Sequence, residues 1–215
     1  MAPGETLSVA VNCVEQGRWH ADEGVGFGFG GRGELDLRKT VRTEKNQQAT
    51  WSKVAEVNAE KSAYVPDEAK PKLAPESGTY RASLNTADVD DKVQPLLGPL
   101  LTHLAADPHT VGFVVAVGAT IEGIELYGSP GLFAAVRTDA ARSVVLEALG
   151  SSARGAAPSD AAATAFLVET LTAPVASRGA KGAGDAVETT GDTTKGYLVR
   201  DKQGELIQAM GYAKK

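Results

Sequence analysis

The chain has 215 residues, of which 42% are hydrophobic and 23% charged, with a formal net charge of −5 at pH 7. This composition is typical of a globular protein, and its length suits a single domain over residues 1–215. The acidic balance, with lysines and arginines scattered along the chain, argues against a nucleic-acid partner, which would require a basic face.

The first third of the chain predicts a strand, a loop and a helix. Residues 6–15 alternate apolar and polar positions, as a strand with one buried face does. Residues 24–33 form a glycine-rich loop, and residues 35–41 ("LDLRKTV") suit a short strand. Residues 43–63 show helical spacing, with Thr43 as the predicted N-cap.

The middle of the chain predicts a helix and a hairpin. Residues 64–83 contain three prolines and read as a connecting loop, whose end at 78–84 suits a short strand. Residues 90–106 carry one apolar stripe; we expect Pro95 in the first turn and a kink at Pro99. Residues 110–117 and 121–127 flank a short turn, which predicts a β-hairpin.

The last third predicts two helices and a second hairpin. Ser129 and Pro130 begin a helix that ends on Gly150, and another helix spans 159–172 with Ser159 or Asp160 as its cap. Residues 173–195 are rich in Ala, Gly and Thr and predict a flexible loop. Residues 195–212 predict a hairpin with Gly204 at its turn. The fold class is therefore α+β: an antiparallel β-sheet with two hairpins, packed by about four helices.

Several function classes lack support. Cys13 is the only cysteine, which excludes an intramolecular disulfide. The N-terminus lacks the features of a signal peptide, and no run approaches the roughly 20 apolar residues of a membrane span. We therefore expect a cytoplasmic protein with no membrane partner.

The sequence around the apparent cofactor and metal motifs does not support a cofactor or metal site. Gly28, Gly30 and Gly33 match the dinucleotide fingerprint, but a polar segment precedes them and no helix obviously follows. The three histidines are far apart and lack zinc-ligand spacing. We expect no metal and no bound cofactor. Cys13 lacks an evident neighbouring base, so a core position fits it better than a nucleophile.

The strand end "VNCVEQGRW" at residues 11–19 is the most unusual stretch. Glu15, Arg18 and Trp19 could form an ion pair covered by the tryptophan, which either holds a turn or positions a ligand phosphate or carboxylate. Both interpretations stay open. Glu15 is the one candidate general acid or base.

Together with "LRKTV", "NQQATWSKV" and "GFVVAVGATIEGIELYGSPGLF", this stretch resembles a bacterial family, the ARG and rhodanese-phosphatase-superfamily-associated protein domain. The resemblance is carried by C-V-E-x-G-R-W, a downstream arginine and a Q-x-x-x-W helix. It implies functional positions at Glu15, Arg18, Trp19, Arg38, Gln47 and Trp51, with Gln48 an ambiguous neighbour of Gln47. The short segment ahead of the signature suggests an N-terminally shortened member.

The family name refers to ADP-ribosylglycohydrolase, so the resemblance implies an association with ADP-ribose and phosphatase chemistry. Our first expectation is a ligand-binding or interaction domain for a nucleotide-like small molecule. In it, the two arginines hold phosphates and a tryptophan stacks on a base or ribose. One alternative is an oligomerisation module whose sheet is completed by a second copy or a partner chain. Another is a hydrolase acting on a phosphorylated or ADP-ribosylated substrate.

Overall fold

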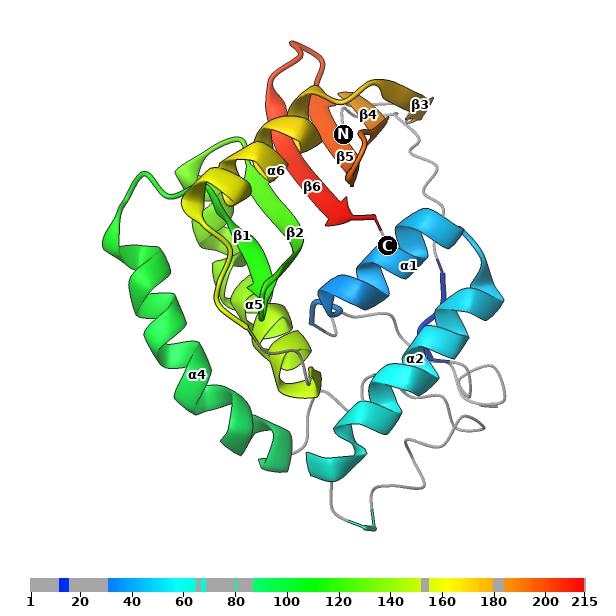
Figure 1. The fold of residues 1–215 in the computed structure, drawn as a ribbon, viewed down its shortest axis with the longest axis vertical. Coiled ribbons are helices and arrows are strands. Elements are labelled where there is room, and N and C mark those ends of the chain that lie inside the picture. The colour runs from blue at the N-terminus through cyan, green and yellow to red at the C-terminus, as the bar shows by residue number, and fades with distance from the viewer. Residues whose placement is uncertain are drawn as a thin grey trace, which may run out of the picture. The chain divides into compact units, whose positions relative to one another are not determined.

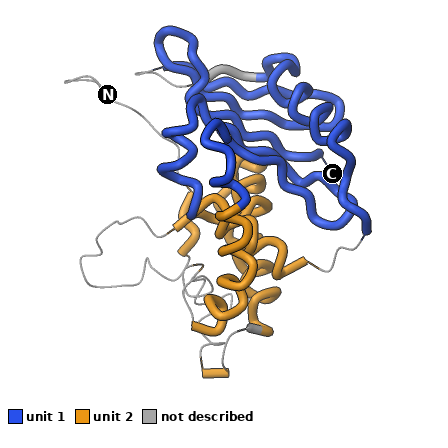
Figure 2. The backbone as a smooth tube through the Cα atoms, turned by 90° about the vertical axis from the view of Figure 1, so that its left-hand side faces the viewer, with its two compact units in different colours: residues 1–10, 103–138, 152–215 blue, residues 11–102, 139–151 orange. Residues whose placement is uncertain are grey.

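The computed structural model describes residues 12–15, 31–64, 67–68, 80, 87–151, 155–179 and 184–214. The chain divides into two compact units. We call residues 1–10, 103–138 and 152–215 the sheet unit, and residues 11–102 and 139–151 the helical unit (Figure 2). Two long helices contribute residues to both units. The expected single domain stays a prediction.

The sheet unit is built on six antiparallel strands in the order β1-β2-β6-β5-β4-β3 (Figure 1). Each strand pairs with its neighbours antiparallel. The strands are β1 (Gly112–Val117), β2 (Thr120–Tyr127), β3 (Val175–Gly179), β4 (Gly184–Thr190), β5 (Thr194–Asp201) and β6 (Leu206–Ala213).

Two of the hairpins are those predicted from the sequence. β1 and β2 turn at Gly118, and β5 and β6 turn at Gly204, with φ values of 60° and 85° respectively. Such left-handed conformations are readily adopted by glycine, which has no Cβ to clash with the backbone. Both hairpin predictions are confirmed.

The prediction of a flexible loop over residues 173–195 is corrected by the structure. Strands β3 and β4 occupy most of this segment. Within β4, Val187 and Thr189 alternate with more exposed residues, and both are buried. The small residues that suggested a loop therefore belong to strands. Whether a short segment forms an edge hairpin depends on which of its side chains are buried, and amino-acid composition does not reveal this.

Helix α6 (Asp160–Thr172) packs closely on one face of the sheet. Its N-cap is Ser159, as predicted, whose side chain accepts a hydrogen bond from the N–H of Ala162. Thr170 of α6 lies against Gly196 and Gly211, where an added Cβ would collide with it. The two glycines thus allow the helix to approach the strands.

Helix α5 (Pro130–Gly150) begins as predicted. The hydroxyl of Ser129 accepts a hydrogen bond from the N–H of Leu132 at 3.2 Å. Within the sheet unit, Phe133 packs against Phe113 of β1 and Tyr127 of β2, with ring centroids 6.0 and 5.7 Å away. This aromatic cluster anchors the start of α5.

In the helical unit, two predictions are wrong. Residues predicted as a short strand form helix α1 (Leu35–Glu44), in which Leu35 and Leu37 are both buried. Their spacing of two imitates a strand, but it also fits the first turn of a helix. Helix α2 (Gln47–Lys61) begins later than predicted and is capped by Asn46, not Thr43. A short 3₁₀ turn, η2 (Ser62–Tyr64), follows α2.

Helix α4 (Ala87–Ala106) begins earlier than predicted, so Pro95 and Pro99 both lie in its interior. The two prolines are exposed and sit four residues apart, on the same side of the helix. The backbone carbonyls that lose a hydrogen bond there can therefore be satisfied by water. The opposite face buries Val89, Val93 and Leu97.

The described part of the chain thus contains five α-helices and a six-stranded antiparallel sheet, and the predicted α+β class is confirmed. The predicted strand at 78–84 lies outside the described residues except for Tyr80, and most of residues 6–15 and 24–33 lie outside them as well. Among the helices that the structure describes, none combines the length and apolar character needed to cross a membrane.

Candidate functional site

Gln47, the first residue of helix α2, binds residues 12–15 of the signature stretch (residues 11–19) through its side chain. Its side-chain Oε1 accepts a hydrogen bond from the N–H of Cys13 at 2.8 Å, and its Nε2 donates to the carbonyl of Cys13 at 2.6 Å. Asn12 donates to Thr50 Oγ1 at 3.0 Å, and the half-buried Cys13 thiol donates to the carbonyl of Glu15. The glutamine amide thereby makes the two backbone hydrogen bonds with residue 13 that a neighbouring β-strand would otherwise make.

The structure resolves which of the two adjacent glutamines makes this contact. Asn46 caps α2 by accepting hydrogen bonds from the backbone N–H groups of Gln48 and Ala49 at 2.8 and 3.4 Å. This start of the helix turns Gln47 toward Cys13, whereas Gln48 is exposed. The Q-x-x-x-W pattern therefore begins at Gln47, four residues before Trp51.

The remaining predicted site residues have separate positions. Arg38 lies on α1, and its Nε donates to the carbonyl of Gly33 at 2.8 Å. Trp51 is half-buried on α2. Both belong to the helical unit together with residues 12–15. Arg18 and Trp19 lie outside the described residues, so their role stays a prediction.

One face of α2 carries polar groups into the interior of the helical unit. Gln47, Trp51, Val54, Asn58 and Lys61 recur at spacings of three and four, which places them along one side of a helix. Asn58 and Lys61 are fully buried, with exposed fractions of 0% and 1%. Lysine is almost never buried without a partner, so this face is specialised.

The partner of Lys61 is Glu34, the residue that precedes α1. Lys61 Nζ lies 2.6 Å from Glu34 Oε1, and the side chains are 1% and 2% exposed. Tyr80 closes the group, because its buried hydroxyl accepts a hydrogen bond from the N–H of Glu34 at 2.9 Å. Three polar side chains from distant points of the sequence therefore meet in a buried cluster.

Burial sets the acid–base behaviour of this cluster. It raises the pKa of Glu34, and the positive charge of Lys61 only partly opposes that shift. Burial, reinforced by the negative charge of Glu34, also raises the pKa of Tyr80 far above its ordinary value. Tyr80 is therefore a neutral phenol at any physiological pH.

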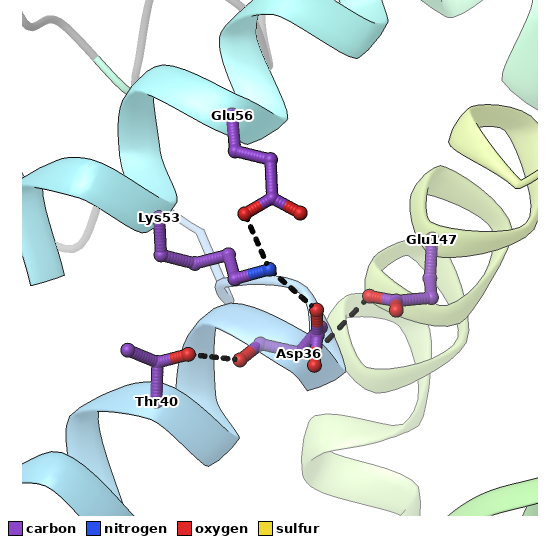
Figure 3. Close-up of polar contacts among 5 residues, drawn as sticks. All are labelled: Asp36, Thr40, Lys53, Glu56 and Glu147. Carbon is purple, nitrogen blue, oxygen red and sulfur yellow. Dashed lines mark hydrogen bonds and ion pairs between the residues drawn. The ribbon is translucent and has the colours of Figure 1, made fainter. Parts of the chain in front are cut away.

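A second, more accessible group lies at the start of α1 (Figure 3). Lys53 Nζ lies 2.7 Å from Asp36 Oδ2 and 2.8 Å from Glu56 Oε2. The backbone N–H of Asp36 donates to Glu147 Oε2 of α5 at 3.2 Å, and Thr40 Oγ1 donates to the carbonyl of Asp36. The side chain of Asp36 is 25% exposed, so solvent reaches this group.

Glu147 has a pKa near neutrality, so its charge changes with pH in that range. Burial raises its pKa from an ordinary value of 4.5 to about 7, and the negative charges of Glu34 and Asp36 add to that effect. The pKa of Lys53 is also raised: burial lowers it, but hydrogen bonds to Asp36 and Glu56 and their charges outweigh burial. Lys53 therefore stays charged.

Some of this hydrogen-bonding capacity is unused within the described part of the chain. The buried Nε1 of Trp51 has no acceptor there. Lys61 has three N–H donors, and Glu34 is its one described partner. Unsatisfied buried polar groups are costly in a folded protein, and they frequently mark sites for water or ligand.

The sequence predicts the signature residues but not the two charged groups. Glu34, Asp36, Lys53, Lys61, Tyr80 and Glu147 come from four separate segments, and no local pattern links them. The one available signal was the position of Lys61 on the same face of α2 as Trp51 and Asn58. As for metals, the described residues contain no group of three or more potential ligands arranged to hold an ion.

Comparisons with known proteins identify the family of the chain. No curated protein and no solved structure gives a significant match. The sequence pattern of the ARG and rhodanese-phosphatase-superfamily-associated protein domain matches residues 1–212. The match includes the residues ahead of the signature, so it gives no support to the expectation of an N-terminally shortened member. With its pattern matched over nearly the whole sequence, the chain belongs to the ARG and rhodanese-phosphatase-superfamily-associated protein domain family.

Proposed function

We propose that the helical unit binds a nucleotide-derived ligand of the ADP-ribose class. The observation that carries this proposal is the polar face of α2, where Trp51 Nε1 and Lys61 Nζ are buried with donors that no described residue satisfies. A ligand with phosphate and hydroxyl oxygens supplies acceptors for both groups. Such a ligand offsets the cost of burying them.

The family supplies the choice of ligand class. Its name refers to ADP-ribosylglycohydrolase, which links its members to ADP-ribose by association. A phosphate-bearing ligand also suits Arg18 and Arg38, because the guanidinium fork matches phosphate geometry. Trp19 or Trp51 would stack on the adenine or a ribose.

Gln47 and Glu15 have supporting roles in this proposal. The amide of Gln47 is engaged with the backbone of Cys13 on both sides, so its part is to fix the signature segment next to α2. Glu15, three residues before Arg18, would orient the guanidinium of that arginine. The ligand itself would contact the arginines and tryptophans.

Calorimetric titration of the full chain with ADP-ribose tests this proposal. We expect saturable binding, and we expect Arg18→Ala and Trp51→Phe each to weaken it by about tenfold, since each removes one hydrogen-bonding group. Arg42→Ala changes an exposed arginine of the same α1 helix that carries Arg38, and it should bind as the unchanged protein does. Equal affinity in Arg18→Ala, Trp51→Phe and Arg42→Ala would contradict the assignment of these residues.

A second candidate function is assembly through a sheet edge. β1 and β3 are the two edges of the six-stranded order, and Val175 of β3 is 49% exposed. Edge strands with exposed apolar residues favour pairing with another chain. Light scattering tests this candidate with Val175→Lys, which would convert an oligomer to a monomer. The control is Val168→Lys on the exposed surface of α6, which should leave the mass unchanged.

A further inference from the structure

The lysine that the proposed function assigns to the ligand is closed off from solvent. Lys61 is 1% exposed, and Glu34, whose Oε1 lies 2.6 Å from Lys61 Nζ, is 2% exposed. Tyr80, whose hydroxyl accepts a hydrogen bond from the N–H of Glu34, is 4% exposed. A ligand therefore reaches Lys61 only if a residue that covers this lysine moves.

One of the covering residues, Glu34, belongs to the start of α1. It is the N-cap residue of this helix, but its side chain makes no capping hydrogen bond. The intrahelical hydrogen bonds begin with the N–H of Arg38, which donates to the carbonyl of Glu34 at 3.0 Å. The N–H groups ahead of Arg38 depend on acceptors from outside the helix, as at the start of any α-helix. The first turn of α1 is therefore held in place by contacts with other elements.

Glu147 of α5 supplies one such contact. The N–H of Asp36 donates to Glu147 Oε2 at 3.2 Å, so a side chain 111 residues away in the sequence takes the part that an N-cap side chain usually plays. The carboxylate of Asp36 contacts Lys53 of α2 at 2.7 Å (Figure 3). All of these residues belong to the helical unit. Because Asp36 and Glu34 lie in the same turn, the hydrogen bond to Glu147 also fixes the cover of Lys61.

We propose that the first turn of α1, residues 34–37, is a gate over Lys61, which is closed by the hydrogen bond from the Asp36 N–H to Glu147 and opens when Glu147 ionises. Opening moves Glu34 away from Lys61 and exposes the polar face of α2. This inference rests on the proposed function and adds its regulation, because a ligand that binds the open form is coupled to the charge of Glu147.

The surroundings of Glu147 favour its neutral form while the gate is closed. Burial raises its pKa from 4.5 to about 7, and the negative charges of Glu34 and Asp36 add to this effect. The hydrogen bond from the Asp36 N–H and the charge of Lys61 lower the pKa and only partly offset the rise. In the open form Glu147 meets solvent, and its pKa returns toward 4.5. A rise in pH from 4.5 to 7 therefore shifts the equilibrium toward the open form, and the shift levels off above pH 7.

The other charged and titratable groups on the elements around Glu147 make contacts of their own. Tyr80 stays neutral, because burial raises its pKa. The remaining groups are Lys53 and Glu56 of α2, which are ion-paired, Arg142 of α5, which is ion-paired with Asp90 of α4, and Glu60 of α2, which lies against Gly150. Glu147 is the group to which we assign the dependence of the gate on pH.

Amide hydrogen exchange of the ligand-free protein tests the gate. The hydrogen bond to Glu147 shields the Asp36 N–H, so the protection factor of this amide, corrected for intrinsic exchange, reports the closed form. It should fall about tenfold from pH 6 to pH 8. Glu147→Gln keeps an acceptor but cannot ionise, so its protection factor should not change with pH. Glu44→Gln changes an exposed glutamate at the end of α1 and should behave as the unchanged protein does.

The amide of Val54 separates opening of the gate from global unfolding. Val54 is a buried residue of α2, so its amide should exchange when the protein unfolds. The Asp36 amide should be at least about tenfold less protected than that of Val54, because it also exchanges from the open form. Equal protection of the two amides would overturn the gate. So would a protection factor of Asp36 that is the same at pH 6 and pH 8 in the unchanged protein.

Titration with ADP-ribose at pH 6 and pH 8 connects the gate to the ligand. Affinity scales with the open fraction, so the unchanged protein should bind about tenfold more tightly at pH 8. Glu147→Gln should bind weakly at both pH values. Glu147→Ala removes the acceptor and should bind at pH 6 as tightly as the unchanged protein does at pH 8.

The outcomes distinguish the gate from the proposed function. Weaker binding by Glu147→Ala than by the unchanged protein at both pH values would make Glu147 a ligand contact and overturn the gate, while nucleotide binding stands. If the Asp36 amide exchanges as expected but ADP-ribose does not bind at either pH, the gate stands and the proposed function fails.

Discussion

At the residue scale, the side chains that matter most for the structure of the helical unit are polar groups that are buried or that use all of their hydrogen-bonding atoms. Gln47 uses both ends of its amide on the backbone of Cys13. Lys61 and Glu34 form a buried ion pair, and removing one partner of such a pair leaves an uncompensated charge. These groups connect segments of the helical unit that lie far apart in the sequence.

The contact of Gln47 predicts a difference between two adjacent glutamines. Gln47→Ala leaves the N–H and carbonyl of Cys13 without their partner, so it should lower the free energy of unfolding by about 1–2 kcal/mol. Gln48→Ala should change it by less than about 0.5 kcal/mol, because that side chain is exposed. Urea denaturation of the two variants measures both values. Equal effects of the two substitutions would contradict the assignment of the hydrogen bonds with Cys13 to Gln47.

The raised pKa of Glu147 predicts a pH-dependent effect on stability. A carboxyl group whose pKa is about 7 when folded and near 4.5 when unfolded binds more protons in the folded state between these values. Its contribution to stability is therefore fully present below about pH 4.5 and is lost as pH rises through 7.

Glu147→Gln should consequently become more stable than the unchanged protein as pH rises. We expect a relative gain on the order of 1–3 kcal/mol between pH 5 and pH 8. Denaturant unfolding at several pH values measures it. A gain that stays constant across this range would mean that Glu147 does not titrate there.

At the element scale, local signals predicted some segments well and others poorly. The caps at Ser129 and Ser159 and the glycine turns of two hairpins are encoded within a few residues, and all were predicted correctly. Helix α1 was missed because a leucine spacing of two fits a strand as well as a first helical turn. Strand β4 was missed because its burial beneath α6 depends on residues distant in sequence, and β3 was missed because it forms by pairing with β4.

The close approach of α6 to the sheet predicts the effect of one added methyl group. A Cβ at Gly211 would collide with the hydroxyl of Thr170 and lie 2.6 Å from its Cγ2 and 2.8 Å from Ile124 Cγ2. Gly211→Ala should therefore destabilise the protein by about 1–3 kcal/mol. Thermal unfolding measures the change.

Two controls make this prediction specific. Gly131→Ala adds its Cβ in the first turn of α5 at an ordinary van der Waals distance, 3.9 Å from Ser129 Oγ, so it should stabilise the protein by up to about 1 kcal/mol. The double variant Thr170→Ala with Gly211→Ala should recover part of the loss, because the colliding side chain is shortened. Full additivity of the two substitutions would show that the contact is not the cause.

At the scale of the whole molecule, the sequence predicted the fold class and family but not the two charged groups. One group joins Glu34, Lys61 and Tyr80, and the other joins Asp36, Lys53 and Glu147; in each, only the tertiary fold brings the residues together. By contrast, the signature motif is local, so it was visible without a structure. The site proposed for a nucleotide-derived ligand combines the arginines and tryptophans of the signature with the buried Lys61, whose group only the fold assembles.

The most direct test of the central claim is calorimetric titration of the full chain with ADP-ribose at pH 8, beside the Trp51→Phe variant. The account predicts saturable binding with one site, weakened about tenfold when the buried indole N–H is removed. No heat of binding to the unchanged protein, together with no shift of its melting temperature in the presence of excess ADP-ribose, would contradict it.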